Sequence, residues 1–368
     1  MNTSYFSCKN NKDFCRILLP NYEQIASALD PNYEGDLENG RKHGRGVYTW
    51  PDGRRYEGQW NDNLKDGHGI ETLSNGERFE GEWKNDKKNG KGTYTWSDGR
   101  RYEGQWKDDI KEGHGIETLP NGERFEGEWK NDKKDGKGVY TWSNGCSFQG
   151  EWNDDKQSDK GVYVWSDGSK YEGQLVNGLK NGKGILTTEN GDRYDGQWKD
   201  NLKNGKGIFT WSDGDKYEGQ YTNDQRCGQG VFTYKSGNRY EGQYTDDKQH
   251  GQGVFTWKNG HRYSGQFNYG SRHGKGVYTW PNGDRYDGCY KDGDRHGQGI
   301  LILANGERYE GNWKDDKKHG KGTLTLKNGN RFEGEWRNGT RDPNGYLYCP
   351  SGMRWNGHLD DNLLNTAR

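Results

Sequence analysis

The chain has 368 residues, with 55 basic and 56 acidic side chains and a net charge of −1, and only 27% of its residues are hydrophobic. Aromatic residues nevertheless make up 14%, so we expect a folded chain that packs rings instead of a thick aliphatic core. The balanced charge gives no support for nucleic-acid binding, and no apolar run approaches the ~18 residues of a membrane helix. Residues 1–20 lack the pattern of a signal peptide, which favours a cytoplasmic chain with reduced cysteines.

The dominant feature of the sequence is a repeated pattern of 23 residues. Each copy begins with an aromatic residue, from Tyr33 to Trp355. Glycine follows this opening aromatic by two residues in all fifteen copies, and by thirteen and twenty residues in all fourteen complete copies. We therefore expect an array of fourteen full repeats and a partial fifteenth at residues 33–359. A non-repeat segment at 1–32 precedes it, where the capping-box spacing of residues 21–24 predicts a short capping helix, and a tail at 360–368 follows.

Each repeat is predicted to be a β-hairpin. In residues 101–107 (RYEGQWK), aromatic residues and glycines alternate with polar ones, which is the period of a strand. A first turn at Asp108-Asp109 and a second turn such as Asn144-Gly145 reverse the chain, and Asn-Gly or Asp-Gly occupies the second turn in twelve of fourteen repeats. The sequence therefore predicts an all-β fold, an elongated, twisted, single-layer antiparallel meander of 23-residue hairpins.

Alternation along the strands predicts two different faces of the sheet. One face, which we call the aromatic face, is expected to coil into a trough of rings and glycines. The other, the polar face, is expected to carry mainly charged residues. The residues assigned to the aromatic face in two example strands are Tyr102, Gly104, Trp106, Gly136, Gly138, Tyr140 and Trp142.

The repeats resemble the MORN repeat (membrane occupation and recognition nexus), whose pattern stands here as RFEGEWKNDKKDGKGVYTWSNG (124–145) and RYDGCYKDGDRHGQGILILANG (285–306). The resemblance covers residues 33 to about 359. The chain is similar to the family members that consist of repeats alone, which are scaffolds of cytoskeletal, ciliary or membrane-associated assemblies. Members that are kinases or methyltransferases carry extra catalytic domains, for which no residues remain here. The resemblance thus implies a scaffold with no enzymatic activity, no cofactor and no small-molecule substrate.

Two binding hypotheses follow from the surface that each face would offer. In the first, a protein partner binds the aromatic trough, since aromatic rings are frequent anchors of binding surfaces. The rings predicted to line this trough are Tyr56, Trp60, Tyr102, Trp106, Phe125, Trp129, Tyr194, Trp198, Tyr217 and Tyr221. In the alternative, the chain is a peripheral membrane rod that binds anionic phospholipids or phosphoinositides. The lysines predicted to make this contact are Lys84, Lys87, Lys88, Lys130, Lys133 and Lys134.

Three further features have simpler interpretations. A basic residue before the opening aromatic and an acidic residue after it lie on one face of a strand, where they are expected to neutralise each other. His250, His273, His296 and His319 share one column, but equivalent residues of successive hairpins lie ~9–10 Å apart, which is too far for a metal site. The last strand, around residues 354–359, is expected to leave an open edge, which favours a homodimer through the C-terminal repeats.

Overall fold

The computed structural model describes residues 30–367 and divides into two compact units, unit 1 up to Ser166 and unit 2 from Asp167. The capping helix predicted near residues 21–24 lies outside the described residues. One short helix, α3 (Asp361–Thr366), accompanies 29 strands in the part of the chain that the structure describes, which confirms the predicted all-β fold. In that part of the chain, no helix is long and apolar enough to cross a membrane.

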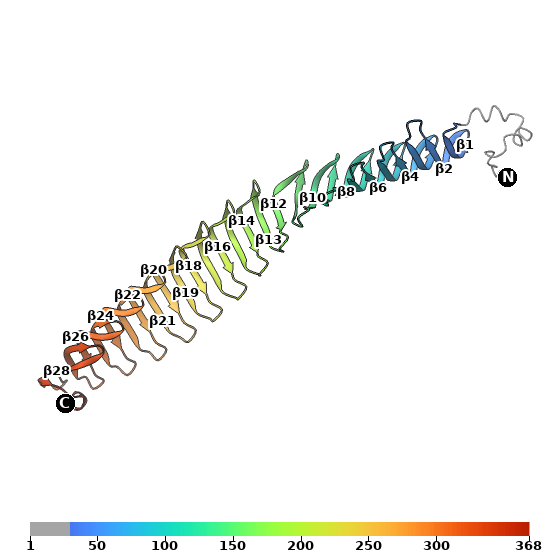
Figure 1. Ribbon diagram of the computed structural model, residues 1–368. Helices are drawn as coiled ribbons and strands as arrows, with labels where there is room; N and C mark the ends of the chain where they lie inside the picture. The colour runs from blue at the N-terminus through green and yellow to red at the C-terminus, as the bar shows by residue number, and fades with distance from the viewer. Residues whose placement is uncertain (1–29, 368) are drawn as a thin grey trace, which may run out of the picture. The chain divides into compact units, whose positions relative to one another are not determined.

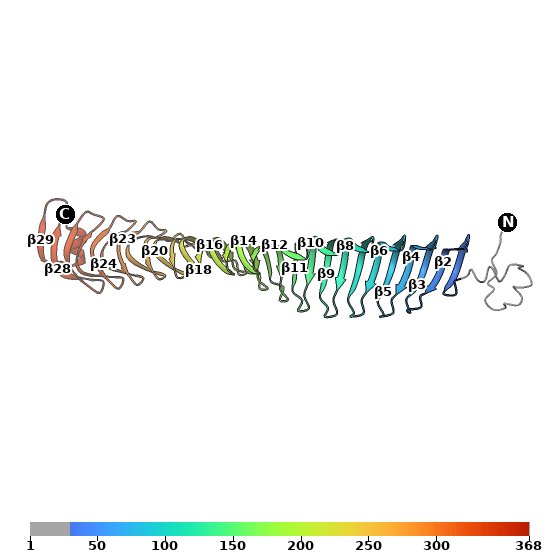
Figure 2. The same cartoon turned by 90° about the horizontal axis from the view of Figure 1, so that it is seen from above.

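Unit 1 is an open antiparallel meander in which each strand pairs with its neighbours in sequence. Figure 1 shows this order as a row of hairpins, and Figure 2 shows β3 to β11 side by side. The strands are β1 (Tyr33–Glu38), β2 (Arg41–Thr49), β3 (Arg55–Asn61), β4 (Leu64–Thr72), β5 (Arg78–Lys84), β6 (Lys87–Thr95), β7 (Arg101–Lys107), β8 (Ile110–Thr118), β9 (Arg124–Lys130), β10 (Lys133–Thr141), β11 (Ser147–Asn153) and β12 (Lys156–Val164).

Unit 2 continues the same pattern, again with antiparallel pairing between strands adjacent in sequence. Its strands are β13 (Lys170–Val176), β14 (Leu179–Thr187), β15 (Arg193–Lys199), β16 (Leu202–Thr210), β17 (Lys216–Thr222), β18 (Gln225–Thr233), β19 (Arg239–Thr245), β20 (Lys248–Thr256), β21 (Arg262–Asn268), β22 (Ser271–Thr279), β23 (Arg285–Lys291), β24 (Asp294–Ile302), β25 (Arg308–Lys314), β26 (Lys317–Thr325), β27 (Arg331–Arg337), β28 (Thr340–Tyr348) and β29 (Arg354–His358). The predicted meander of 23-residue hairpins is confirmed.

The first turn of a repeat is a two-residue turn with both residues in the left-handed region. Between β9 and β10 these residues are Asn131 (φ 50°) and Asp132 (φ 65°), side chains that tolerate this conformation. The turn also bonds to the preceding repeat, because the Asp132 N–H donates to the Lys111 carbonyl at 3.2 Å. In return, the Lys111 N–H donates to Asp132 Oδ1 at 2.8 Å. These reciprocal bonds hold successive hairpins together along one margin of the sheet.

The second turn contains three residues and a bulge. The Trp142 N–H donates to the Cys146 carbonyl at 2.9 Å, and the Gly145 N–H donates to the Trp142 carbonyl at 3.0 Å. Gly145 has φ +84°, whereas Asn144 does not have a positive φ, so the turn is not the two-residue kind with both residues left-handed. The Asn-Gly pair therefore marks the correct place for the turn but specifies a longer loop.

The second strand of each hairpin bulges against the first. In β10 the register with β9 shifts between Lys134 and Gly138. Gly136 lies in this bulge with φ +104°, and a Cβ atom there would come within 3.0 Å of the Glu128 Cβ on the polar face. The assignment of Gly136 to the aromatic face is therefore wrong, because strict alternation fails inside this bulge, where β10 has two more residues than β9 between the two pairs.

The core is a single layer of rings lying on bare backbone. A Cβ atom added at Gly127 or Gly138 would approach the Phe125 ring to 2.8 or 2.4 Å, so the ring needs both glycines. Phe125 is only 1% exposed. It makes edge-to-face contacts with Trp129 at 5.4 Å and with Trp152 of the next repeat at 5.2 Å between ring centroids. Each repeat thus completes the core of its neighbour, as in other repeat proteins.

Candidate functional site: the aromatic face

The ten rings predicted to line the trough belong to an inner ring row, formed by the opening aromatic and the residue four positions after it. All ten are buried, with exposures between 0% and 6%: Tyr56, Trp60, Tyr102, Trp106, Phe125, Trp129, Tyr194, Trp198, Tyr217 and Tyr221. Their rings contact glycine backbone and one another, so a partner reaches them only if the sheet opens. A binding role for these ten rings stays a prediction, and their burial argues against direct contact.

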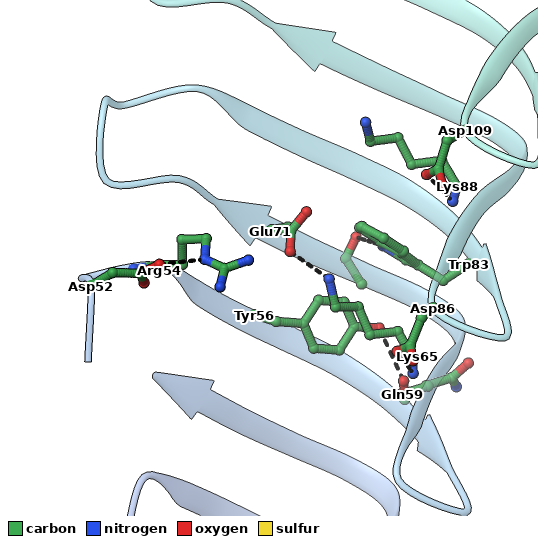
Figure 3. A network of polar contacts seen from close by, with 11 residues as sticks. Asp52, Arg54, Tyr56, Gln59, Lys65, Glu71, Trp83, Asp86, Lys88 and Asp109 are labelled. Atoms are coloured by element: carbon green, nitrogen blue, oxygen red, sulfur yellow. Dashed lines mark hydrogen bonds and ion pairs between the residues drawn. The ribbon is translucent and has the colours of Figure 1, made fainter. Parts of the chain in front are cut away.

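A column of side chains nine residues after the opening aromatic, basic in twelve of the fourteen complete repeats, lies on the inner ring row (Figure 3). The Lys65 Nζ lies 4.2 Å from the Trp83 ring centroid and 5.2 Å from that of Tyr56. Its ammonium also pairs with the Glu71 carboxylate. The Lys65 N–H donates to Asp86 Oδ1 at 2.8 Å, so the backbone of the same residue joins the next repeat. Attraction to the ring faces stabilises a cation in this partly dehydrated position.

Two of the six predicted lipid-binding lysines belong to this basic column. The Lys88 Nζ lies 4.6 Å from the Tyr94 ring centroid, and the Lys134 Nζ lies 4.9 Å from that of Tyr140. Burial lowers the pKa of the Lys88 ammonium, as expected for a cation removed from water. These two ammonium groups therefore face rings of their own sheet, and each is half-buried.

The other four predicted lipid-binding lysines are exposed at the first-turn margin of unit 1: Lys84, Lys87, Lys130 and Lys133. The Lys87 ammonium lies 3.7 Å from a carboxylate oxygen of Asp108, and that of Lys133 lies 3.1 Å from Asp154. Neighbouring carboxylates thus reduce the positive potential that an anionic membrane would meet. Lipid binding by these lysines stays a prediction.

A second set of rings, the outer ring row, occupies the positions fifteen and seventeen residues after the opening aromatic. Where both positions are aromatic, these residues are half-buried except Phe232, which is buried. They are Tyr48, Trp50, Tyr94, Trp96, Tyr140, Trp142, Tyr163 and Trp165 in unit 1, and Phe209, Trp211, Phe232, Tyr234, Phe255, Trp257, Tyr278 and Trp280 in unit 2. The ten-ring prediction missed this row, although alternation had already placed Tyr140 and Trp142 on the same face.

The polar face carries the predicted ladder of neutralising charge pairs. Arg55 and Glu57 approach to 2.6 Å, and Arg101 and Glu103 to 2.7 Å. The same pairing recurs in other repeats of both units. The predicted neutralisation is therefore confirmed at these pairs, and solvent-exposed pairs of this kind add little binding energy.

The histidine column lies at the first-turn margin of unit 2. The His273 Nδ1 lies 3.7 Å from Asp292 Oδ1 in the next repeat, and His296 makes the equivalent approach to Asp315. Among residues 30–367, no cluster of three or more His, Cys, Asp or Glu residues is arranged to hold a metal ion.

The C-terminal tail folds onto the aromatic face as α3. Leu359 and Leu364 are buried, at 0% and 3% exposure. Asn330, itself 1% exposed, donates its amide to the carbonyls of Leu364 and Ala367, both at 2.8 Å. The outer-row position Leu347 is also buried, at 0% exposure.

The comparison with family models agrees with this architecture. The model described as "MORN repeat" matches fourteen consecutive segments, namely residues 33–54, 56–78, 79–100, 102–124, 125–147, 148–170, 171–193, 194–216, 217–239, 240–262, 263–285, 286–308, 309–331 and 332–354. The chain belongs to the MORN repeat family. MORN repeats are generally protein- or lipid-binding scaffold motifs, and they mediate protein or membrane interactions.

Other comparisons add no argument about this MORN repeat chain. No curated protein matches it. Among solved structures, it is similar to the Drosophila melanogaster SAS-4 (dCPAP) TCP domain in complex with a proline-rich motif of Ana2 (dSTIL). The sequence identity is 15% and the TM-score is 0.27, and the match covers 53% of this chain and 97% of that chain. The wild-type TCP10 domain of Danio rerio CPAP matches at 11% identity and a TM-score of 0.21, over 67% and 99%. Scores this low carry no argument about function.

Proposed function

We propose that this MORN repeat chain is a non-catalytic, cytoplasmic scaffold that binds other proteins and organises cytoskeletal, ciliary or membrane-associated assemblies. The observation that carries the proposal is the outer ring row, which offers half-buried rings to a partner along the aromatic face. Half-buried aromatic rings supply contact area at low cost in side-chain entropy. The polar face, by contrast, is covered with charge pairs that satisfy each other.

The test compares one variant on each face of unit 2, using a partner first identified by proximity labelling. Trp257→Ala removes an outer ring, and Arg193→Glu reverses a charge on the polar face. We expect affinity for the purified partner to fall with Trp257→Ala and to stay near the wild-type value with Arg193→Glu. Loss of affinity only in Arg193→Glu, with both variants folded, would move the binding site to the polar face.

The alternative function, a membrane rod, is supported by the four exposed lysines at the first-turn margin of unit 1. Co-sedimentation with vesicles that contain phosphoinositide separates the two functions. The scaffold proposal expects no more co-sedimentation than with neutral vesicles. Phosphoinositide-dependent co-sedimentation that Lys84→Glu and Lys130→Glu abolish would favour the membrane rod.

A further inference from the structure

The outer ring row is continuous in only part of the described chain. In unit 2 it runs without a break from Phe209 to Trp280, through four consecutive repeats. Successive ring centroids along it lie between 4.4 and 5.9 Å apart. In unit 1, Glu71 and Glu117 replace a ring in alternate repeats and pair with lysines of the basic column. The stretch from 209 to 280 therefore offers the longest uninterrupted aromatic surface among residues 30–367.

This aromatic stretch is also positively charged. Residues 209–280 contain nine Lys and Arg residues against seven Asp and Glu residues, a net charge of +2 in a chain whose total is −1. Lys235 and Lys258 are exposed at the second-turn margin, beside Tyr234 and Trp257 of the outer row. The ring surface is thus flanked by cations, which favours a ligand that is both apolar and acidic.

One cation of the basic column in this stretch has no carboxylate partner. In other repeats, the guanidinium of Arg226 bonds to Asp247 at 3.0 Å and that of Arg295 bonds to Asp316 at 2.9 Å. Both acids stand 21 residues after the arginine.

The residue 21 positions after Arg272 is Gly293, which has no carboxylate. Its carbonyl oxygen accepts a hydrogen bond from the Arg272 guanidinium at 2.6 Å. The Arg272 guanidinium lies 5.4 and 5.2 Å from the ring centroids of Tyr278 and Tyr290. No carboxylate of the described residues comes within ion-pair distance of it. The carboxylates of Asp294 and Asp316 interact with it electrostatically without pairing, so the guanidinium keeps hydrogen-bonding capacity to spare.

The tail of the chain shows how such a surface is occupied. Arg341 is the member of the same basic column in the last complete repeat, and it donates to Asp361 Oδ1 and to the Leu359 carbonyl, both at 2.9 Å. The same short segment buries Leu364 against the aromatic face. An acidic segment that buries Leu359 and Leu364 thus already binds this face of unit 2, with the Asp361 carboxylate on the column cation.

We propose that the aromatic face from Phe209 to Trp280 binds an acidic, amphipathic segment of a partner protein. Its apolar side chains lie on the outer ring row, and one of its carboxylates binds Arg272. The inference rests on the proposed scaffold function and names the class of partner for that face.

The test measures fluorescence polarisation of two labelled helical peptides with the full chain at low salt. One peptide carries leucines on one side and glutamates on both flanks, and the other has lysine in place of every glutamate. We expect the glutamate peptide to bind and the lysine peptide to bind at least about tenfold more weakly. Trp257→Ala and Arg272→Gln are each expected to weaken binding of the glutamate peptide by about tenfold or more.

The matched control is Arg239→Gln, which removes the same charge from the polar face of unit 2, where Arg239 pairs with Glu241 at 2.6 Å. Its affinity should stay within about twofold of the wild type, since exposed pairs contribute little. Equal losses in Arg239→Gln and Arg272→Gln would overturn the assignment of Arg272 and leave only a general charge effect. Equal binding of both peptides would overturn the acidic partner class, while protein binding by the aromatic face would still stand.

A second experiment, with lipid vesicles, distinguishes a protein ligand from a lipid surface. The probe is a vesicle of phosphatidylcholine with phosphatidylserine, tested by co-sedimentation with the wild type and with Arg272→Gln. We expect no Arg272-dependent co-sedimentation. If vesicles bound through Arg272 and neither peptide did, the protein-partner inference would be wrong and the acidic ligand would be a membrane.

Discussion

Gly138→Ala tests whether the core depends on rings that lie on bare backbone. The new Cβ atom would lie 2.4 Å from two carbon atoms of the Phe125 ring, whereas the nearest backbone atom is 3.3 Å away. The backbone tolerates a side chain there, because Gly138 has no positive φ. The ring must therefore leave its site and lose its contacts with Trp129 and Trp152. Expelling a buried phenylalanine should cost about 3–5 kcal/mol, as much as its removal.

The decisive comparison is a double-mutant cycle with Phe125→Ala. Because the ring causes the clash, Gly138→Ala should cost little once the ring is gone. The coupling between the two changes should then be about 3 kcal/mol or more. Hydrogen exchange of peptides from β9, β10 and β11 measures the local opening free energy, which suits a repeat protein that opens locally. Additive costs would refute the packing of the ring on this glycine.

Three further predictions concern stability and assembly. Burial raises the pKa of Tyr171 to about 12, so its stabilising effect is complete below pH ~10 and is lost as the pH rises toward 12. Tyr171→Phe should therefore unfold at higher pH than the wild type in a titration of tyrosinate absorbance and circular dichroism, and an unchanged midpoint would contradict this. Glu71→Gln should destabilise its hairpin by about 1–3 kcal/mol in hydrogen exchange, because Lys65, only 8% exposed, loses its carboxylate. Glu71→Tyr, the residue type of the outer row, should cost less, and equal costs would argue against the ion pair. The exposed Trp355 (50%) lies on the last strand, β29, so we expect a dimer by light scattering that deletion of 332–368 converts to a monomer. An unchanged mass per assembly would rule out this interface.

The repeat, the hairpins and the first turns could be predicted because they depend on residues close together in sequence. The period of 23 sets the hairpin length, and paired residues such as Asn131 and Asp132 specify a turn by their own conformational preferences. Gly136 was placed on the wrong face because alternation along one strand gives no sign of a bulge against its partner. The bulge appears only in the register between two strands.

The candidate site was harder to predict because exposure depends on neighbouring repeats. The Tyr102 ring is buried partly by Trp129 of the next repeat, which alternation within one strand cannot show. Lys88 looked like a surface lysine, although its even spacing from Tyr94 places it on the aromatic face. The docking of α3 depends on the amide of Asn330, a single side chain more than thirty residues earlier in the chain.

The measurement that tests the central claim most directly is side-chain footprinting of the full chain with and without a bound protein partner. Radical or carbene labelling reports how accessible each residue is. We predict that Trp211 and Trp257 of the outer ring row lose reactivity in the complex, whereas Arg193 and Arg239 on the polar face keep theirs. Protection confined to the polar-face residues, with the outer tryptophans as reactive as in the free chain, would contradict the account.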